Sequence, residues 1–402
     1  MARYARDEDA LFAFGHKLQM RGQFRQAAKL YGQVLSLNPE NTGCLNNLGN
    51  CLRSLGRDAD AIPFFHRALA IHPGKRSARL NLGMARLALG QYEAAWPNYE
   101  ARLEIVDYRK EAWTSGKPRW NGQPLERGER LFVYGNQGLG DELQCLRYLP
   151  WVSRLAPNHV IEVQAPLFPL VKGMPGIGEV MVRPEDRALP AFDHHVEFFS
   201  LPEIFGTTAN RIPPVVAPPV SGRSEVVSFL RRDQIAHPGG KRIGLVWSGN
   251  PENEINRFRA CGLVHLQKLL DVSNCRFFSL QKGIPRRELE ERAGDRLIDL
   301  APMLNDMRET AMALRELDLL ITPDTSVPHL AGTIGTPAWV LLHEPADWRW
   351  GRRGERTPWY PKLRLFRQEK PGHWMPVVER VKSELERFAE SPGGRPALSP
   401  TG

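Results

Sequence analysis

The sequence lacks the features of a membrane-spanning chain and of a disulfide-rich secreted protein. Its 402 residues contain no uninterrupted apolar run near 20 residues, the length that a membrane-spanning helix requires. Five cysteines are present, without any CxxC spacing, so neither a disulfide framework nor a zinc site is indicated. The N-terminus also lacks the apolar core of a secretory signal. We therefore expect a cytoplasmic protein with no membrane span and no bound metal.

No strong excess of one charge sign is present either. Lys and Arg total 54 against 45 for Asp and Glu, which leaves a formal net charge of +9. The excess is spread along the chain and is not gathered in a polybasic arm. This balance suits an anionic small ligand such as a nucleotide. It is weak evidence for nucleic acid, and we expect none among the partners.

A repeat with a period of 34 residues fills the N-terminal quarter of the chain. Each unit predicts two amphipathic helices, because its first glycine lets the pair approach closely and its second glycine ends the first helix. The units at 8–41, 42–75 and 76–109 resemble the tetratricopeptide repeat. The positions in register are Gly15, Gly49 and Gly83; Gly22, Gly56 and Gly90; Ala27, Ala61 and Ala95; and Tyr31, Phe65 and Tyr99.

Stacked repeats of this kind form a curved superhelix whose concave groove is lined by the first helix of each unit. Helical phase predicts His16 and Asn50 in that groove. Asn47 and Asn81, each in an Asn-Leu-Gly triplet, resemble the asparagines with which the repeats of O-GlcNAc transferases hold an extended peptide. The alternative is that these asparagines satisfy backbone groups between repeats. We expect a protein or peptide partner in the groove.

The hydrophobic pattern changes from helical to α/β after the repeats. Short buried strands alternate with helices in two runs, which predicts two Rossmann-like lobes with ligands at the carboxyl ends of the strands. The expected fold class is thus an all-α superhelix followed by an α/β part. The predicted boundaries are the repeat array at 8–109, a linker at 110–130, the first lobe at 131–205, a proline-rich hinge at 206–240, the second lobe at 241–390 and a disordered tail at 391–402.

A glycine-rich turn follows the first expected strand. Its glycines, Gly135, Gly138 and Gly140, run GxxGxG, whereas a dinucleotide site needs GxGxxG and a Walker loop needs Gly-Lys-Ser/Thr. Both of those sites are therefore disfavoured. Asp141 then opens a helix, where an acid either caps the helix or faces the cleft as a general base.

The second lobe carries a complementary segment, in which hydroxyl side chains and backbone N–H groups open a helix directly after a strand. Such a helix start predicts an anion site for a diphosphate, and arginines of a neighbouring loop would add positive charge. One lobe would then hold a phosphorylated donor and the other a base, which is the layout of sugar transfer from a nucleotide donor. The residues are Asp324, Thr325, Ser326 and His329, with Arg257 and Arg259 in the loop.

Several ordered segments resemble glycosyltransferases that carry tetratricopeptide repeats. They are residues 137–141, 147–150, 244–251, 279–282, 324–325, 329–332, 347–350 and 359–361. The catalytic half resembles the ADP-heptose lipopolysaccharide heptosyltransferases, glycosyltransferase family 9, which have the GT-B fold. The domain layout is similar to O-GlcNAc transferase-like and flagellin-modifying enzymes.

The resemblance implies a role for each matching residue. Asp141 corresponds to the general base of an inverting, metal-independent transfer, and the segment 324–329 corresponds to the donor site, with Arg257 or Arg259 neutralising phosphate. Ser248, Asn250 and Lys282 are expected on the donor side, and Gln137, Gly138, Gly140 and His195 on the acceptor side, although a structural role for His195 is the alternative. The donor is a nucleotide sugar, and no cofactor is implied.

Two departures from the family pattern, Asn136 and Ala260, keep a second function open. The chain would then be a non-catalytic repeat scaffold with a degenerate transferase half. A dinucleotide oxidoreductase is supported by the fold class alone.

Two further features have structural interpretations. The acidic triplets at 7–9 and 58–60 predict solvated helix surface. The basic, aromatic stretch 349–367 predicts a wall of the donor cleft rather than a nucleic-acid surface.

Overall fold

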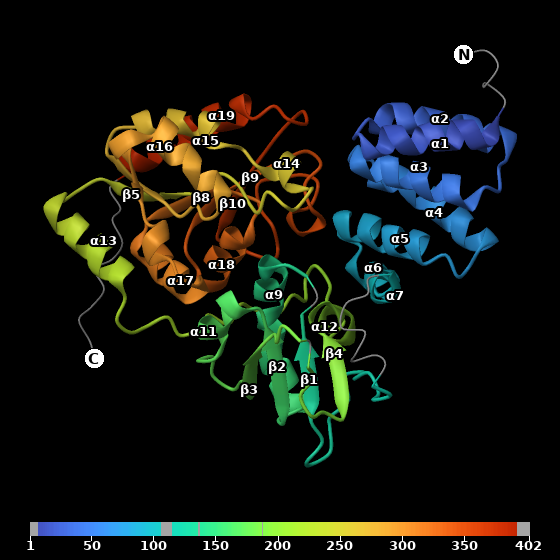
Figure 1. Ribbon diagram of the computed structural model, residues 1–402, viewed down its shortest axis with the longest axis horizontal. Coiled ribbons are helices and arrows are strands. Elements are labelled where there is room, and N and C mark those ends of the chain that lie inside the picture. The colour runs from blue at the N-terminus through green and yellow to red at the C-terminus, as the bar shows by residue number, and fades with distance from the viewer. Residues whose placement is uncertain (1–6, 106–114, 136, 187, 392–402) are drawn as a thin grey trace. The chain divides into compact units, whose positions relative to one another are not determined.

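The structure is a computed structural model that describes residues 7–105, 115–135, 137–186 and 188–391 (Figure 1). The chain divides into two compact units. The first, called the repeat unit below, comprises residues 1–110, 202–212 and 344–354. The second, called the α/β unit, comprises residues 111–201, 213–343 and 355–402. Both units therefore combine segments that are distant in the sequence.

Three helical hairpins form the repeat unit, as the 34-residue period predicts, and they stack in sequence order in Figure 1. Their helices are α1 (Glu8–Met20), α2 (Phe24–Leu37), α3 (Thr42–Ser54), α4 (Asp58–Ile71), α5 (Arg76–Ala88) and α6 (Tyr92–Tyr99), followed by the short α7 (Arg102–Ile105).

The repeated glycines have the two roles that the pattern predicts. A Cβ atom on Gly49 would lie 2.5 Å from the ring of Phe65, and one on Gly83 would lie 2.7 Å from the backbone nitrogen of Tyr99. Gly22, Gly56 and Gly90 have φ angles of 75°, 72° and 74° just after the first helix of each hairpin. A larger side chain is disfavoured in that left-handed conformation, so glycine ends the helix there.

Two segments from later in the chain pack on the third hairpin. The 3-10 helix η8 (Trp348–Trp350) places the ring of Trp348 edge-on to that of Trp96, with centroids 5.8 Å apart. The indole Nε1 of Trp96 donates to the carbonyl of Thr207 at 2.8 Å. The predicted boundaries assigned 202–212 to the first lobe and the hinge, and 344–354 to the second lobe, whereas the contacts group both with the repeats. These segments cover apolar surface at the end of the array, which a solenoid must bury.

The first sheet of the α/β unit has four parallel strands in the order β3-β2-β1-β4. The strands are β1 (Leu131–Tyr134), β2 (His159–Val163), β3 (Glu179–Val182) and β4 (His194–Glu197). The glycine-rich turn leads from β1 into α9 (Leu139–Cys145), which is followed by η1 (Leu146–Tyr148) and α10 (Leu149–Leu155). The helix after the turn therefore forms where the sequence predicts it.

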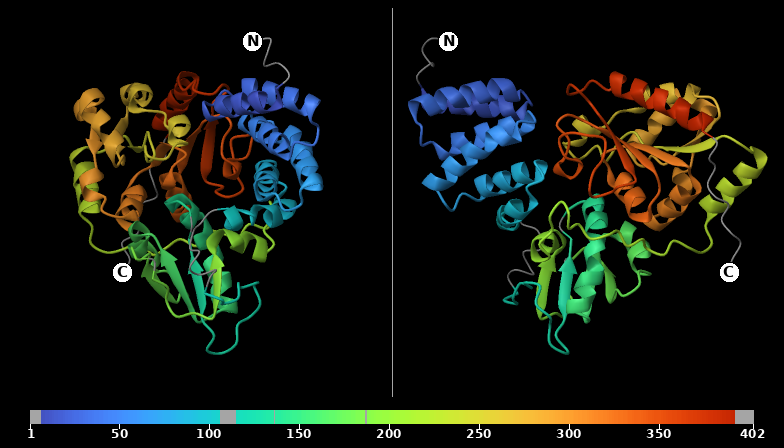
Figure 2. Two further views of the ribbon diagram at one scale, coloured as in Figure 1. Left: turned by 45° about the vertical axis from the view of Figure 1, so that its right-hand side comes forward. Right: turned by 180° about the vertical axis from the view of Figure 1, so that it is seen from behind.

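The second sheet has six parallel strands in the order β10-β9-β8-β5-β6-β7, with helices on both faces (Figure 2). Because β8 lies between β5 and β9, the carboxyl ends of these strands are neighbours, at the position where doubly wound sheets bind ligands. The strands are β5 (Lys241–Leu245), β6 (Cys275–Ser279), β7 (Leu297–Asp299), β8 (Leu319–Pro323), β9 (Ala338–Leu342) and β10 (Leu363–Arg367). The helices include α14 (Asn256–Arg259), α15 (Leu263–Leu266), α16 (Glu288–Arg292), α17 (Met307–Glu316), α18 (Ser326–Ile334) and α19 (Met375–Glu390). The expected fold class is confirmed.

The predicted hinge at 206–240 is wrong in part, because it contains the regular helix α13 (Glu225–Ala236). Ser224 caps this helix by accepting from the backbone nitrogen of Val227 at 3.3 Å. Val226 and Leu230 are fully buried, and α13 packs against α17. Its apolar face is therefore part of the core, which the high proline content of the flanking sequence concealed.

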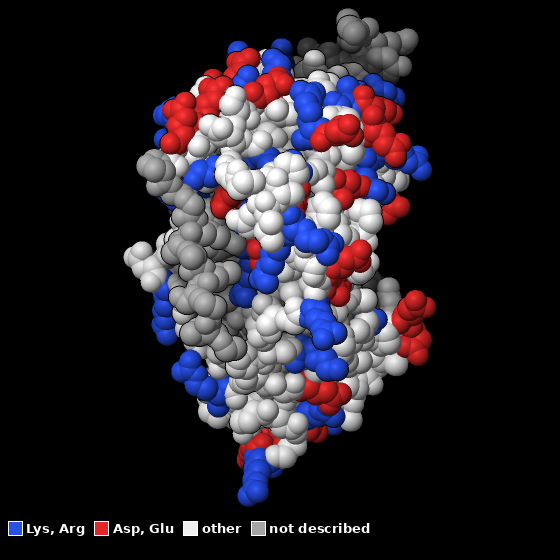
Figure 3. All heavy atoms as spheres, turned by 90° about the vertical axis from the view of Figure 1, so that its left-hand side faces the viewer, with Lys and Arg blue, Asp and Glu red and all other residues white. Residues whose placement is uncertain are grey.

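The surface agrees with the composition. On the face drawn in Figure 3, Lys and Arg side chains are interspersed with Asp and Glu. Across the described part of the chain, no helix is long and apolar enough to cross a membrane.

Candidate functional site

The α/β unit brings the glycine-rich turn and the segment after β8 together. Gly140 lies against the imidazole of His329: a Cβ atom at residue 140 would be 2.7 Å from Cδ2 of that ring. The helices that carry the two residues, α9 and α18, pack on each other. Two segments that were assigned to opposite lobes therefore adjoin without space for one additional methyl group.

Asp141 lies in the first turn of α9 and is half-buried. Its Oδ2 accepts a hydrogen bond from the backbone nitrogen of Gly138 at 2.8 Å. The capping role that the sequence offers as an alternative is thus present, although Gly138 occupies the N-cap position itself. A carboxylate at a helix start is stabilised by the free N–H groups and by the helix dipole.

The donor-side candidates gather around a buried acid. Asp324 follows β8 and is 5% exposed; its Oδ2 lies 3.3 Å from Nε of Arg259. His329 places Nε2 4.0 Å from Asp324 Oδ1 and shares a hydrogen bond of 3.0 Å between Nδ1 and the Tyr360 hydroxyl. The hydroxyl of Thr325, the N-cap of α18, accepts from the backbone of Val327 at 3.3 Å.

The two candidate arginines separate in the structure. Arg259 makes the ion pair with Asp324, whereas Arg257 is exposed and holds its guanidinium 4.7 Å from the centre of the Phe258 ring. Arg259 is accordingly the arginine beside the start of α18. Ser326 is the first residue of that helix.

Two amides that the sequence did not single out build the turn after β5. Gln281 Oε1 accepts from the backbone nitrogens of Trp247 and Ser248, both at 2.9 Å. Asn256 donates to the Ser248 hydroxyl at 3.0 Å and accepts from the backbone nitrogen of Gly249 at 2.9 Å. Both amides are buried, and only their tertiary partners distinguish them from ordinary surface amides.

The remaining donor-side candidates make local contacts. Asn250 is exposed and accepts from the backbone nitrogen of Glu252 at 3.1 Å, which closes a small turn. Lys282 is also exposed, and its Nζ donates to the carbonyl of Leu304. Neither contact involves the cluster around Asp324.

The side chain of His195 is buried within the first lobe. It is 2% exposed on β4, and its ring packs against those of Tyr134 and Phe192 at centroid distances of 6.0 Å. Burial lowers the pKa of His195 to about 4, and the charge of Arg119 adds to this effect. This burial favours the structural role, which is the alternative to the expected acceptor contact.

Arg147 links the first lobe to two later segments of the α/β unit. This buried arginine donates to the carbonyls of Trp359 at 3.0 Å and Pro213 at 3.4 Å. Its guanidinium also lies 5.0 Å from the centre of the Tyr360 ring, the ring that hydrogen-bonds His329. The arginine thereby fixes the segment that holds His329.

A second buried network lies beneath the glycine-rich turn, and the sequence did not indicate it. Glu142, directly after Asp141, is 1% exposed. Its carboxylate accepts from Arg183 Nη2 at 2.8 Å and from Gln164 Nε2 at 3.0 Å. In the sequence, this network is signalled only by the position of Glu142 directly after the candidate base.

In the repeat unit, the predicted groove asparagines bond mainly to other side chains. Asn47 donates to the Tyr31 hydroxyl at 3.3 Å, and Asn81 donates to Asn46 at 3.1 Å. Arg53 donates to Asn81 at 3.2 Å and to Asn50 at 3.1 Å. His16 is exposed on α1. Together these bonds form a polar ladder that connects the three repeats.

The ladder ends at a buried ion pair, which contradicts the prediction that 58–60 is solvated surface. The Asp58 side chain is fully buried and pairs with Arg352, with Nε to Oδ2 at 2.5 Å and Nη2 to Oδ1 at 3.0 Å. Arg53 lies 3.8 Å from the same carboxylate, and burial lowers its pKa to about 10. Arg352 therefore belongs to the repeat unit, and the prediction that the whole stretch 349–367 lines a donor cleft is wrong for this residue.

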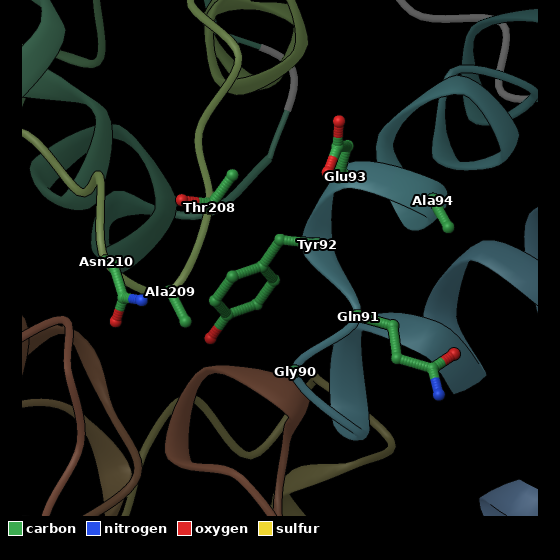
Figure 4. Close-up of a pocket in the computed structure, with 8 residues that line it drawn as sticks. All are labelled: Gly90, Gln91, Tyr92, Glu93, Ala94, Thr208, Ala209 and Asn210. Carbon is green, nitrogen blue, oxygen red and sulfur yellow. The ribbon is translucent and has the colours of Figure 1, made fainter.

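An open pocket also lies in the repeat unit (Figure 4). It is lined by Gly90, Gln91, Tyr92, Glu93 and Ala94 and by Thr208, Ala209 and Asn210. Its lining joins the start of α6 to the segment 202–212.

Among the residues that the structure describes, no group of three or more His, Cys, Asp or Glu side chains could hold a metal ion. Asn136 lies outside the described residues.

Comparison with known proteins supports the repeat assignment. Residues 12–76 match the family model of the tetratricopeptide repeat. Protein FlbA of Caulobacter vibrioides is 29% identical over an alignment that covers 91% of this chain and 70% of FlbA. Among solved structures, E. coli ADP-heptose lps heptosyltransferase II is 14% identical, with 65% of this chain and 98% of that chain covered and a TM-score of 0.45. The crystal structure of MamA is 21% identical, with 28% of this chain and 63% of that chain covered and a TM-score of 0.24. The chain thus joins helical repeats, of which residues 12–76 match the tetratricopeptide model, to an α/β unit built on two parallel sheets.

Proposed function

We propose that this chain is a glycosyltransferase that moves a sugar from a nucleotide-diphosphate donor to an acceptor. The observation that carries the proposal is the close approach of Gly140 to His329. It brings the turn that holds Asp141 beside the helix start that follows Asp324. A base and an anion site are the two parts that such a transfer needs.

The proposed reaction inverts the configuration of the sugar. Asp141 takes the proton from an acceptor hydroxyl as that oxygen attacks the anomeric carbon, and the bond to the nucleotide diphosphate breaks. The N-terminus of α18 and Arg259 stabilise the negative charge of the leaving diphosphate. These groups supply positive potential without a metal ion, and the nucleotide sugar is a substrate rather than a cofactor.

The proposed acceptor is a protein or peptide held by the repeat groove. Asn47, Asn50 and Asn81 are half-exposed, so each retains surface for an incoming peptide group in addition to its bonds within the ladder. Tetratricopeptide arrays present a continuous concave surface that suits an extended chain. Protein glycosylation in the cytoplasm would be the resulting activity.

A non-catalytic scaffold is the second candidate. It is favoured by the hydrogen bond between Asp141 and Gly138, because this contact gives the acid a structural purpose independent of chemistry. Arg259 likewise has a partner within the protein, because it forms an ion pair with Asp324. Its charge is therefore balanced without a bound phosphate.

The variant Asp141→Asn separates the two candidates. An asparagine oxygen can still accept from Gly138 and preserve the cap, but it cannot take a proton. For a transferase we expect about a 10²- to 10⁴-fold lower turnover and an unchanged melting temperature. The matched control is Asp7→Asn, since Asp7 also accepts from a backbone nitrogen at a helix start, in the repeat unit.

A panel of nucleoside diphosphates and nucleotide sugars tests the donor site independently, because any ligand that binds only the folded chain raises its melting temperature. Stabilisation by one nucleotide identifies the donor base. If no nucleotide stabilises the chain and no transfer is detected in the parent protein, the scaffold is the correct function. If transfer occurs and survives in Asp141→Asn, the assignment of the base is wrong.

A further inference from the structure

Glu142 holds a buried position on the side of α9 that faces the first sheet. Its carboxylate accepts three hydrogen bonds: from the backbone nitrogen of Gln164 at 3.1 Å, from Gln164 Nε2 at 3.0 Å and from Arg183 Nη2 at 2.8 Å. Such charge-assisted bonds are strong where water is excluded. Burial raises the pKa of Glu142, and its bonds to Gln164 and Arg183 oppose that rise.

The two donors of Glu142 also hold the glycine-rich turn. Arg183 Nη2 donates to the carbonyl of Gly135 at 2.8 Å, and Gln164 Nε2 donates to the carbonyl of Gln137 at 3.2 Å. The carboxylate, its two donors and the two carbonyls therefore form one connected network. The Glu142 carboxylate therefore helps to hold both donors in the orientation that reaches the turn, and Glu162 adds a second bond to Arg183 through Nε at 3.1 Å.

The close packing of Glu142 explains one glycine of the turn. A Cβ atom at Gly135 would collide with Glu142 Oε1 and would lie 2.8 Å from its carboxyl carbon. Any side chain at residue 135 would displace the buried carboxylate. The network thus accounts for a glycine at residue 135.

The position of Asp141 depends on the same turn. Its Oδ2 is held by the backbone nitrogen of Gly138, one residue beyond the carbonyl that Gln164 holds. A shift of the turn moves this N–H group and with it the carboxylate. Misplacing a reacting group by about 1 Å costs roughly 10²-fold in rate.

We propose that Glu142 is a positioning residue, which fixes the glycine-rich turn through Arg183 and Gln164 and thereby aims the carboxylate of Asp141. Its effect on catalysis rests on the proposed function, whereas its hold on the turn does not. The Glu142 side chain is only 1% exposed, so it would act on the reaction through the turn.

The test compares Glu142→Gln with Glu162→Gln in the full chain. Glu162 is a matched control, because it is also fully buried and accepts from Arg183, through Nε at 3.1 Å. Amide hydrogen exchange at Gly138 and Asp141 reads the turn without any substrate. We expect at least a tenfold faster exchange in Glu142→Gln and a smaller change in Glu162→Gln.

A milder variant, Gln164→Met, covers the case in which Glu142→Gln does not fold. It removes the bond to the carbonyl of Gln137 and retains the backbone bond from residue 164 to Glu142. Faster exchange at Gly138 and Asp141 is expected here as well. Unchanged exchange in both variants, or an equal change in Glu162→Gln, overturns the proposal.

Kinetics then test the catalytic consequence. In a transferring protein we expect Glu142→Gln to lower kcat at least tenfold and to leave the KM for the nucleotide sugar within about twofold. A lower melting temperature alone would not produce that split. If exchange rises but the parent transfers no sugar, the proposed function fails and the structural hold stands; if kcat is unchanged while exchange rises, the positioning role in catalysis is overturned.

Discussion

Replacing Asp58 by asparagine removes a carboxylate that pairs with both Arg352 and Arg53 in the repeat unit. The side chain of Asp58 is 0% exposed, and those of Arg352 and Arg53 are 16% and 13% exposed. Removing one partner of a buried pair costs about 3 to 5 kcal/mol, because the remaining charge loses its partner without regaining water. Because both arginines are partly exposed, we expect Asp58→Asn to lower the free energy of unfolding by about 3 kcal/mol, the lower end of this range.

A double-mutant cycle isolates this interaction. Asp58→Asn, Arg352→Met and the double variant are unfolded with urea, and the loss of helical content is followed by circular dichroism. We expect the cost of the double variant to be at least about 1 kcal/mol smaller than the sum of the two single costs, since each single variant already breaks the pair.

Asp60→Asn is the matched control for this cycle. Asp60 lies on the same helix and pairs with Arg57 at 2.7 Å, but both side chains are more than half exposed, at 54% and 59%. Exposed pairs contribute about 0 to 1 kcal/mol. If Asp58→Asn costs no more than Asp60→Asn, or if the single costs simply add, the ion pair does not anchor segment 344–354 to the repeats.

Two further predictions concern the α/β unit. The pKa of His195 is about 4 in the folded chain, whereas an unperturbed histidine has a pKa of 6.5, so between these pH values the unfolded chain binds a proton that the folded chain excludes. Stability is therefore full above pH 6.5 and falls by up to about 3 kcal/mol as the pH drops to 4. Urea midpoints across this range should show a shallower slope in His195→Phe; parallel slopes would contradict the assignment. In Gly140→Ala the new methyl group displaces the ring of His329, and we expect at least a tenfold higher KM for the nucleotide sugar. A parent-like KM, measured with the fold intact by circular dichroism, would show that this contact does not shape the donor site.

Local features of the molecule were predictable from the sequence. The 34-residue register located six helices because glycine, alanine and aromatic residues each have a defined role in a helical hairpin. The glycine-rich turn before Asp141 and the helix start after Asp324 were predictable for the same reason, since a turn and a cap depend on residues that adjoin in the chain. Helix α13 was missed because the prolines around it obscured its apolar face.

Burial and pairing were decided only by the tertiary structure. Asp58 and Asp60 belong to one acidic triplet, yet Asp58 is buried and Asp60 is exposed. The partner of Asp58 is 294 residues away in the chain, and no local pattern encodes such a distance. The same reason conceals Glu142 and the burial of His195: whether a polar side chain meets water, a charge or a ring is set by whatever segment the fold brings against it. The sequence alone indicated most of the elements, helix α13 excepted, and the packing determined which of their polar residues are buried and paired.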